Sequence, residues 1–224
     1  MRPRLVPRLF AEFIRGWQER ARSVGAELLA VTPDRLAGIL RRLLPRARVV
    51  LQQGEFFGER LEAAFQAAFA GEAASVVAVP GDAPPPNAEA IVNLFRHLEK
   101  YDDAMAIAPS EDGGVNLLGF ARSAQRDLGS VAWFGPSVCS DLLSHSERFN
   151  LPLLVAAALF DIDQVEDVWK LYRRSLLDAT WLSIRHLLAA VLCTPLVAAR
   201  RVLLMPNEVF GTAVHVRGPP AYAT

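Results

Sequence analysis

Short apolar runs alternate along the chain with longer stretches whose apolar residues recur every three or four positions. The runs predict buried strands, and the periodic stretches predict amphipathic helices. We expect helices over residues 9–24, 34–44, 59–69, 88–98, 137–144, 165–172 and 181–192. We expect strands or short extended segments at 26–31, 48–52, 76–79, 104–108, 115–120, 131–134, 157–160, 202–205 and 212–216. The alternation predicts an α/β fold, a three-layer sandwich with helices around a mainly parallel mixed sheet.

The stretch from Ser75 to Pro86 (SVVAVPGDAPPP) holds the clearest of these strands. Its apolar run is bounded by Pro80-Gly81, which is typical of a strand buried on both faces. Asp82 follows the carboxyl end of this strand, where open α/β sheets bind ligands. The alternative is that Asp82 belongs to a surface turn and binds nothing.

Two further acidic turns follow predicted strands. Glu111 and Asp112 precede a pair of glycines, and Asp161 and Asp163 form an Asp-Ile-Asp turn. Because parallel strands can open on one edge of a sheet, we expect these turns to share a cleft with Asp82. Mg²⁺ or Mn²⁺ is held by one or two carboxylates plus substrate phosphates, whereas the four scattered histidines lack the spacing of a zinc site. The acidic turns therefore favour a metal–nucleotide complex.

Composition narrows the class of protein. Of the 224 residues, 24 are basic and 24 acidic, so no net field would recruit nucleic acid or an anionic membrane. The most apolar window, 180–199, contains Arg185 and His186, so we expect no membrane span. Cys139 and Cys193 form no CxxC pair and no disulfide framework, and no secretory signal is visible. We therefore expect a cytoplasmic protein. The GxSxG, Walker A and GxGxxG motifs are also absent from the sequence.

Six motifs occur in the order of a known family: QGEFFGERL at 53–61, PGDAP at 80–84, APSEDGG at 108–114, LG at 118–119, Trp133, and DIDQVEDV at 161–168. Together they resemble the GT-A-type transferases called radical-SAM/selenodomain-associated transferases, which belong to the nucleotide-diphospho-sugar transferase superfamily and are similar to the molybdenum cofactor and 2-phospholactate guanylyltransferases. The resemblance covers about residues 1–174. It implies a GT-A-like transferase domain at 1–175, followed by a C-terminal helix and strand extension at 176–224.

The resemblance also implies the metal and the acceptor side of the site. Asp82 and the Asp-Ile-Asp turn would hold Mg²⁺ or Mn²⁺, with Asp163 favoured over Asp161. The turn with Glu111 and Asp112 would lie on the acceptor side, which makes these two the candidate catalytic residues. A divalent ion on a diphosphate neutralises charge that develops on the leaving group.

A second set of residues would bind the nucleotide donor. Gly58, Glu59 and Arg60 match the family's G-E-R segment, which flanks the nucleotide. Arg2 and Arg4 match the end of the family's basic K-T-R-L segment. The fork of an arginine guanidinium suits phosphate oxygens, so we include these arginines among the candidate ligands.

The sequence departs from the family pattern at three places. It starts within the K-T-R-L segment, so the family's first strand and Gly-rich loop have no counterpart before it. Phe56 replaces an acidic residue, and Val115-Asn116 replaces an aromatic pair. We expect Phe56 and Phe57 beside the nucleotide cleft, stacking on a base or plugging the site. The alternative is that both are ordinary core residues.

A missing first strand would leave two facing strand edges in the sheet, and each unpaired buried polar group costs about 1–3 kcal/mol. We expect residues 202–205, an apolar run, to fill this central position. The competing interpretation is a C-terminal hairpin that includes 212–216 and lies on the outer edge of the sheet or on a helix.

Two functions are open from the sequence. One is metal-dependent transfer of a glycosyl or nucleotidyl group from a small-molecule nucleotide donor to an acceptor that the sequence does not identify. The other is a non-catalytic relative that keeps the fold as a binding or scaffolding module, which the absent first strand and Phe56 motivate. The sequence does not set the oligomeric state.

Overall fold

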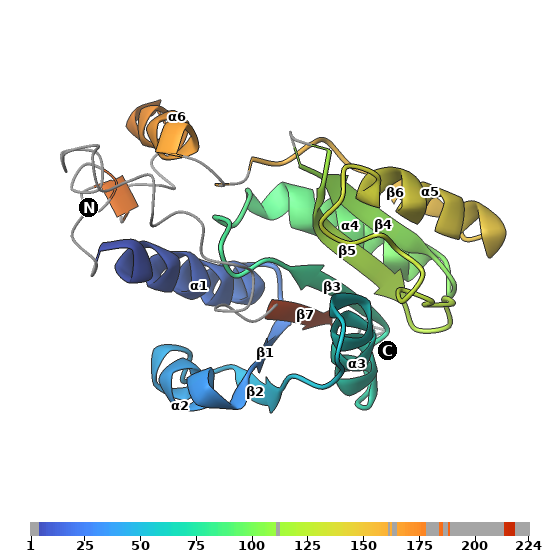
Figure 1. Ribbon diagram of the computed structural model, residues 1–224. Helices are drawn as coiled ribbons and strands as arrows, with labels where there is room; N and C mark the ends of the chain where they lie inside the picture. The colour runs from blue at the N-terminus through green and yellow to red at the C-terminus, as the bar shows by residue number, and fades with distance from the viewer. Residues whose placement is uncertain are drawn as a thin grey trace, which may run out of the picture.

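The computed structural model describes residues 5–110, 113–160, 162, 165–177, 184–185, 188 and 213–217. The helices are α1 (Leu5–Ser23), α2 (Asp34–Leu43), α3 (Phe57–Phe69), α4 (Ala88–Lys100), α5 (Val138–Arg148) and α6 (Val165–Leu177). The strands are β1 (Glu27–Thr32), β2 (Arg48–Leu51), β3 (Ser75–Val79), β4 (Met105–Pro109), β5 (Val115–Ala121), β6 (Leu153–Val155) and β7 (Ala213–Arg217). Within the described residues, the strands form one sheet in the order β2-β1-β7-β3-β5-β4-β6 (Figure 1).

Most strands of this sheet run in the same direction. β1 is parallel to β2, and β4 is parallel to β6. β7 is antiparallel to β1 and to β3, and β5 is antiparallel to β3 and to β4. Five strands therefore run one way, and only β5 and β7 run the other among the described strands. The predicted α/β fold with a mainly parallel mixed sheet is confirmed.

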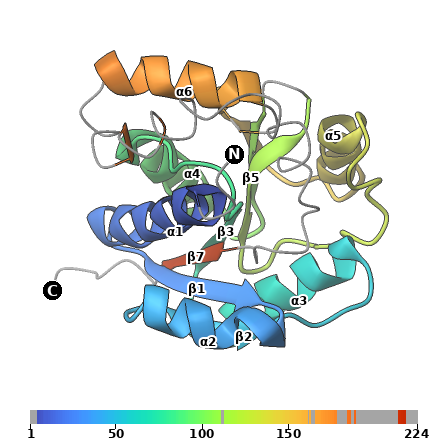
Figure 2. The ribbon, with the colours of Figure 1, turned by 60° about the vertical axis from the view of Figure 1, so that its left-hand side comes forward.

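Alternate residues of the central strands face two different helical layers. Val76 and Ala78 of β3 pack in the core formed with α3 and α5. Val77 and Val79 pack in the core formed with α1, α2 and α4. Figure 2 shows α1 and α4 on one side of the central strands and α3 and α5 on the other. Because every residue of β3 is buried, its continuous apolar run is explained by burial on both faces. The three-layer arrangement is the predicted one.

The N-terminal part of α1 forms a smaller core with the chain beyond β6. Phe10 and Phe13 of α1 pack with Val168 and Leu171 of α6. None of the described helices is long and apolar enough to cross a membrane.

The centre of the sheet is filled by β7, which lies between β1 and β3. His215 is paired with Leu28 on one side and with Val77 on the other. The prediction that residues 202–205 fill this position was wrong, and so was the outer-edge position for 212–216. Residues 202–205 themselves lie outside the described part of the chain. A strand from the predicted C-terminal extension thus satisfies both facing edges, because its antiparallel ladders give partners to the backbone groups of β1 and β3.

Two other predicted strands were wrong. Residues 131–134 form turns, and the Asp141 carboxylate of α5 accepts a hydrogen bond from the backbone N–H of Ala132 there. Residues 157–160 are not a strand, since β6 at Leu153–Val155 occupies the ladder on β4. Leu159 makes only an isolated bridge to Ser110. Both predicted segments are apolar, but neither pairs along a neighbouring strand, and the ladder on β4 is formed by Leu153–Val155 instead.

Candidate functional site

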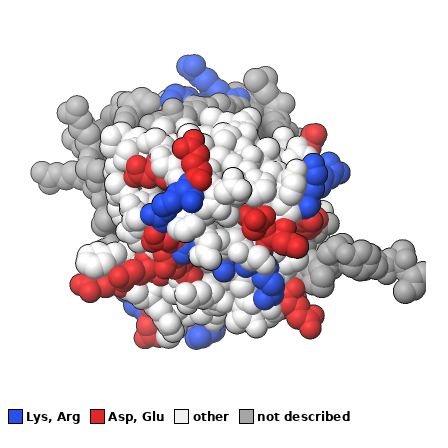
Figure 3. Space-filling model, turned by 90° about the vertical axis from the view of Figure 1, so that its right-hand side faces the viewer, with Lys and Arg blue, Asp and Glu red and all other residues white. Residues whose placement is uncertain are grey.

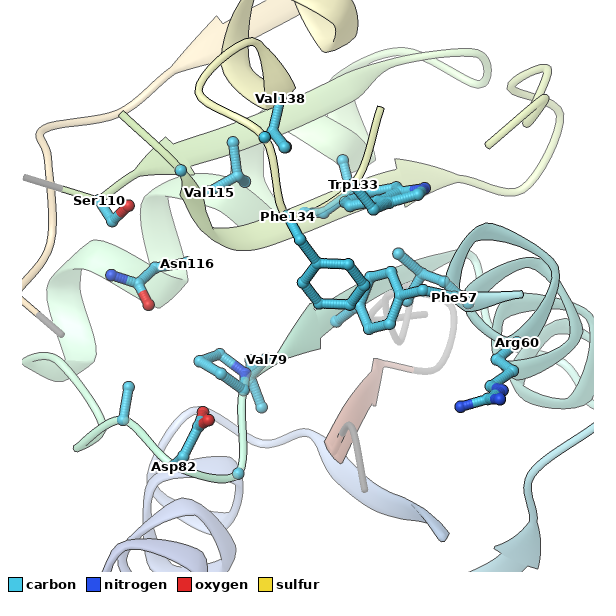
Figure 4. A pocket seen from close by; sticks show the side chains of 18 of the residues that line it. Phe57, Arg60, Val79, Asp82, Ser110, Val115, Asn116, Trp133, Phe134 and Val138 are labelled. Atoms are coloured by element: carbon cyan, nitrogen blue, oxygen red, sulfur yellow. The ribbon is translucent and has the colours of Figure 1, made fainter. Parts of the chain in front are cut away.

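A cavity of about 700 Å³ opens at the carboxyl ends of β2, β3 and β4 (Figure 4). Gln52 follows β2, Asp82 follows β3, and Ser110 follows β4, and all three line this cavity. This is the edge at which ligands bind in open α/β sheets. On the face of the molecule in Figure 3, acidic and basic side chains lie interspersed, as the balanced composition leads one to expect.

Helix α1 fixes the loop that carries Asp82. The indole Nε1 of Trp17 donates a buried hydrogen bond to the carbonyl oxygen of Ala83 at 3.0 Å. A Cβ at Gly16 would lie 3.1 Å from Cγ of Pro85, so α1 approaches the proline run closely. Figure 4 shows the Asp82 carboxyl group directed into the cavity. The loop that carries Asp82 is therefore anchored to α1 and is not a free surface turn.

The charge of Asp82 is not offset by a neighbouring cation within the described part of the chain. Burial raises the pKa of Asp82 above its ordinary value of 3.8, and a hydrogen bond from its own backbone opposes that effect in part. No ion pair involves Asp82 among the described residues. A partly buried carboxylate in a cavity is the kind of oxygen ligand that Mg²⁺ and Mn²⁺ take. Asp82 can supply one such oxygen ligand, and the divalent ion itself stays a prediction.

The predicted G-E-R segment stabilises the start of α3, and one of its residues lines the cavity. Glu59 Oε2 accepts hydrogen bonds from the backbone N–H groups of Glu55 (2.8 Å) and Phe56 (3.3 Å), and so caps the start of α3. Arg60 donates to the carbonyl oxygens of Gly54 (3.3 Å) and Glu55 (2.7 Å). Only Arg60 of the three residues lines the cavity, and it is the one cationic side chain among the described lining residues.

Gly58, the first residue of that segment, packs beneath an aromatic wall made of Phe57, Trp133 and Phe134. The ring of Phe57 meets Trp133 and Phe134 edge to face, with centroids 4.9 and 5.0 Å apart. A Cβ at Gly58 would lie 2.9 Å from the carbonyl carbon of Leu128. Gly58 therefore permits a close approach between α3 and the loop of Trp133.

Phe56 projects at the rim of the same cavity. Its side chain is 66% exposed, and both Phe56 and Phe57 line the cavity together with Asp82. The expectation that the two phenylalanines lie beside the cleft is confirmed. The alternative of two ordinary core residues does not hold for Phe56, while Phe57 is partly buried against the core.

The side of the cavity opposite the aromatic wall is polar. Asn116 is only 8% exposed, and its Nδ2 donates to the carbonyl oxygen of Leu159 at 3.2 Å. Its Oδ1 is directed into the cavity in Figure 4, near the side where Ser110 and Asp82 lie. In the sequence, Asn116 is notable only as a residue that replaces an aromatic one. The missed signal was an amide placed within an otherwise apolar strand.

Six of the predicted site residues lie outside the described part of the chain, so their roles stay predictions: Arg2, Arg4, Glu111, Asp112, Asp161 and Asp163. The structure does describe residues next to the four acidic ones in the chain. Ser110, Gly114 and Ile162 line the same cavity as Asp82. The three segments that carry the predicted acidic turns thus reach one cavity.

Comparison with known proteins shows one family and a solved structure that this chain resembles. Residues 18–134 match the family described as "Uncharacterized protein conserved in bacteria (DUF2064)". The fold is similar to the crystal structure of a "putative nucleotide-diphospho-sugar transferase" from Desulfovibrio desulfuricans G20. The two share 26% sequence identity with a TM-score of 0.71, over 81% of this chain and 84% of that chain. No curated protein matches the chain.

Proposed function

Because the chain belongs to the DUF2064 family and shares its fold with a protein named as a nucleotide-diphospho-sugar transferase, we propose that it transfers a glycosyl group from a nucleotide-activated donor. In this reaction the anomeric carbon bonds to an acceptor oxygen while its bond to the β-phosphate oxygen breaks. The nucleoside diphosphate leaves with the electron pair, and a base takes the proton of the acceptor hydroxyl. We propose Glu111 or Asp112 as that base, on their sequence positions alone.

The observation that carries the proposal is the Asp82 carboxylate, held in the cavity at the end of β3 without a cationic partner among the described residues. We propose that Asp82 binds Mg²⁺ or Mn²⁺ together with Asp163, with Asp161 as the alternative second ligand. When bound, the ion would neutralise charge on the departing diphosphate. In its ionised form, Asp82 would supply the negative charge that attracts the ion to this edge of the sheet.

The nucleotide has two partners in the described part of the cavity. Arg60 supplies positive charge for phosphate oxygens, and we propose that Arg2 and Arg4 add to it. The exposed ring of Phe56 offers a stacking surface for the base, at one turn of α3 from Arg60. Stacking of a base on an aromatic side chain contributes about 1–3 kcal/mol. Gly58 and Glu59 support this arrangement by packing and capping.

A thermal-shift screen tests the proposal. UDP, GDP, ADP and CDP would each be added with and without Mg²⁺ or Mn²⁺, since a ligand at a hundred times its Kd adds about 2.7 kcal/mol of stability. We expect one nucleotide to stabilise the wild type only with the metal, and Asp82→Asn to abolish that effect. Asp103→Asn, at an exposed position outside the cavity, is the matched control. If no nucleotide stabilises the protein with either metal, the transferase proposal fails and the non-catalytic interpretation is favoured.

A further inference from the structure

Phe134 adopts a backbone conformation that a bulky residue rarely takes. Its φ is +67°, and Asn150 (φ +51°) is the other non-glycine residue with positive φ among the described residues. Asn tolerates the left-handed region, whereas a phenylalanine there is an outlier. The side chain is also 68% exposed, so burial of the ring does not compensate for the strain. Such strain persists where the surroundings impose it and is concentrated at ligand-binding sites.

Hydrogen bonds to two neighbouring helices hold the loop that carries Phe134. A carboxylate oxygen of Glu62, from α3, accepts a hydrogen bond from the backbone N–H of Gly129 at 3.1 Å. Asp141, from α5, accepts one from the backbone N–H of Ala132 at 3.0 Å. Two helices thus hold this loop just before the aromatic pair, and the backbone N–H of Gly135 donates to the carbonyl oxygen of Ala132 at 3.2 Å to close the turn around Phe134. Two helices hold an exposed ring in a costly conformation, which preorganises it.

The ring of Phe134 meets Phe57 along one side and faces the cavity with the rest of its surface (Figure 4). Across the cavity lie Asn116 Oδ1 and the Asp82 carboxylate, both hydrogen-bond acceptors. The Asn116 amide is fixed by its bond to Leu159, so its oxygen keeps this direction. A ligand in this space meets a flat apolar surface on one wall and acceptor oxygens on the other.

We propose that Phe134 and Asn116 form the acceptor subsite and that the acceptor is a sugar. The flat carbon face of the sugar ring lies on the phenyl ring of Phe134, and a hydroxyl group donates to Asn116 Oδ1. This inference rests on the proposed glycosyl transfer, which needs a hydroxyl-bearing acceptor beside the donor. Phe56 and Arg60, at the rim of the cavity, serve the nucleotide.

Saturation-transfer NMR tests the subsite, with methyl glycosides of glucose, galactose, mannose and xylose as probes. Phe134→Gly removes both the ring and the strain, and Asn150→Gly is the matched control for strain relief outside the cavity. We expect Phe134→Gly to melt at or above the wild-type temperature and to bind the best probe at least tenfold more weakly. Asn150→Gly should bind that probe like the wild type. Phe134→Tyr, which keeps an aromatic surface, should retain binding.

Nucleotide stabilisation with Mn²⁺, measured on the same variants, separates the possible outcomes. Retained nucleotide binding with lost sugar binding in Phe134→Gly supports the acceptor subsite. Lost nucleotide binding would assign the ring to the donor base and overturn the inference. Unchanged sugar binding in Phe134→Gly, or no probe bound by the wild type, would also overturn it. If the glycine variant fails to fold, Asn116→Ala tests the same subsite through its weaker sugar binding. Sugar binding by a wild type that binds no nucleotide would refute the transfer while leaving Phe134 a sugar contact.

Discussion

Gly58 lies so close to Trp133 that a Cβ on the glycine would be 2.9 Å from the indole Nε1. That distance is below any that real Cβ atoms adopt, so a side chain at 58 would displace the loop. The indole itself is fixed, because its Nε1 donates to the carbonyl oxygen of Leu128 at 2.8 Å. The first turn of α3 and the loop of the aromatic wall therefore form one packed unit.

Gly58→Ala should lower the free energy of unfolding by about 1–3 kcal/mol, since it overpacks this contact. Urea denaturation monitored by circular dichroism measures the change. Gly129→Ala is the matched control, because a Cβ there meets no atom within 4 Å. Equal stability of the Gly58 and Gly129 variants would show that the loop of Trp133 can shift to accommodate the added Cβ without a loss of stability.

Trp17→Phe should loosen the loop that carries Asp82. The substitution leaves the buried carbonyl oxygen of Ala83 without its indole donor, which costs about 1–3 kcal/mol. We expect lower stability and, through the displaced loop, weaker binding of nucleotide with Mn²⁺. Trp169→Phe, on the partly exposed Trp169 of α6, controls for the loss of an indole. A Trp17 variant with unchanged stability and unchanged nucleotide affinity would show that α1 does not hold the loop of Asp82 in place.

Asp82 should make the fold less stable at neutral pH than in mild acid. Its pKa is raised in the folded state, so the folded protein holds a proton that the unfolded chain has lost. The free energy of unfolding therefore decreases as pH rises from 3.8 to the raised pKa, and it stays lower above that value. Each unit of upward shift corresponds to about 1.4 kcal/mol.

Asp82→Asn tests this by urea denaturation at several pH values. The variant should be more stable than the wild type at neutral pH, and the difference should vanish below pH 3.8, where both states of the wild type are protonated. If the Asp82→Asn variant is instead less stable than the wild type at neutral pH, burial does not destabilise the Asp82 carboxylate, and the prediction is wrong. The same variant should lose metal-dependent nucleotide binding.

Strand β7 should be essential for the fold, because it joins β1 to β3. Val214 pairs with Leu29 and Ala78, and Val214→Pro removes its backbone N–H from the middle of the sheet. Each buried group left unpaired costs about 1–3 kcal/mol, so we expect a large fall in melting temperature. Ala223→Pro, beyond β7, is the control. Wild-type melting of the Val214 variant would show that β7 is dispensable.

Sequence periodicity predicted the layers well, because each long helix buries one apolar stripe. It failed where distant pairing decided the outcome. Residues 202–205 are more continuously apolar than 213–217, yet β7 holds the central position, and its partners β1 and β3 lie far away in the chain. Residues 131–134 contain apolar residues, but Asp141 holds the N–H of Ala132 in a turn.

The sequence predicted the part of the site that follows a strand, but not the part that depends on tertiary packing. Asp82 follows a buried strand, so the strand-end rule located it. The aromatic wall depends on the positive φ of Phe134 and on the depth of Gly58 beneath the loop, and neither is encoded by local periodicity. Trp133, one of the family motifs, marked that loop in the sequence, but neither its backbone conformation nor its packing.

A crystal structure with Mn²⁺ and the nucleoside diphosphate that stabilises the protein most tests the central claim directly. The account predicts an anomalous manganese peak within about 2.5 Å of an Asp82 carboxylate oxygen, with the diphosphate on the same ion. Arg60 should contact a phosphate oxygen in that complex. A manganese peak away from Asp82, or a nucleotide bound outside the cavity at the ends of β2, β3 and β4, would contradict it.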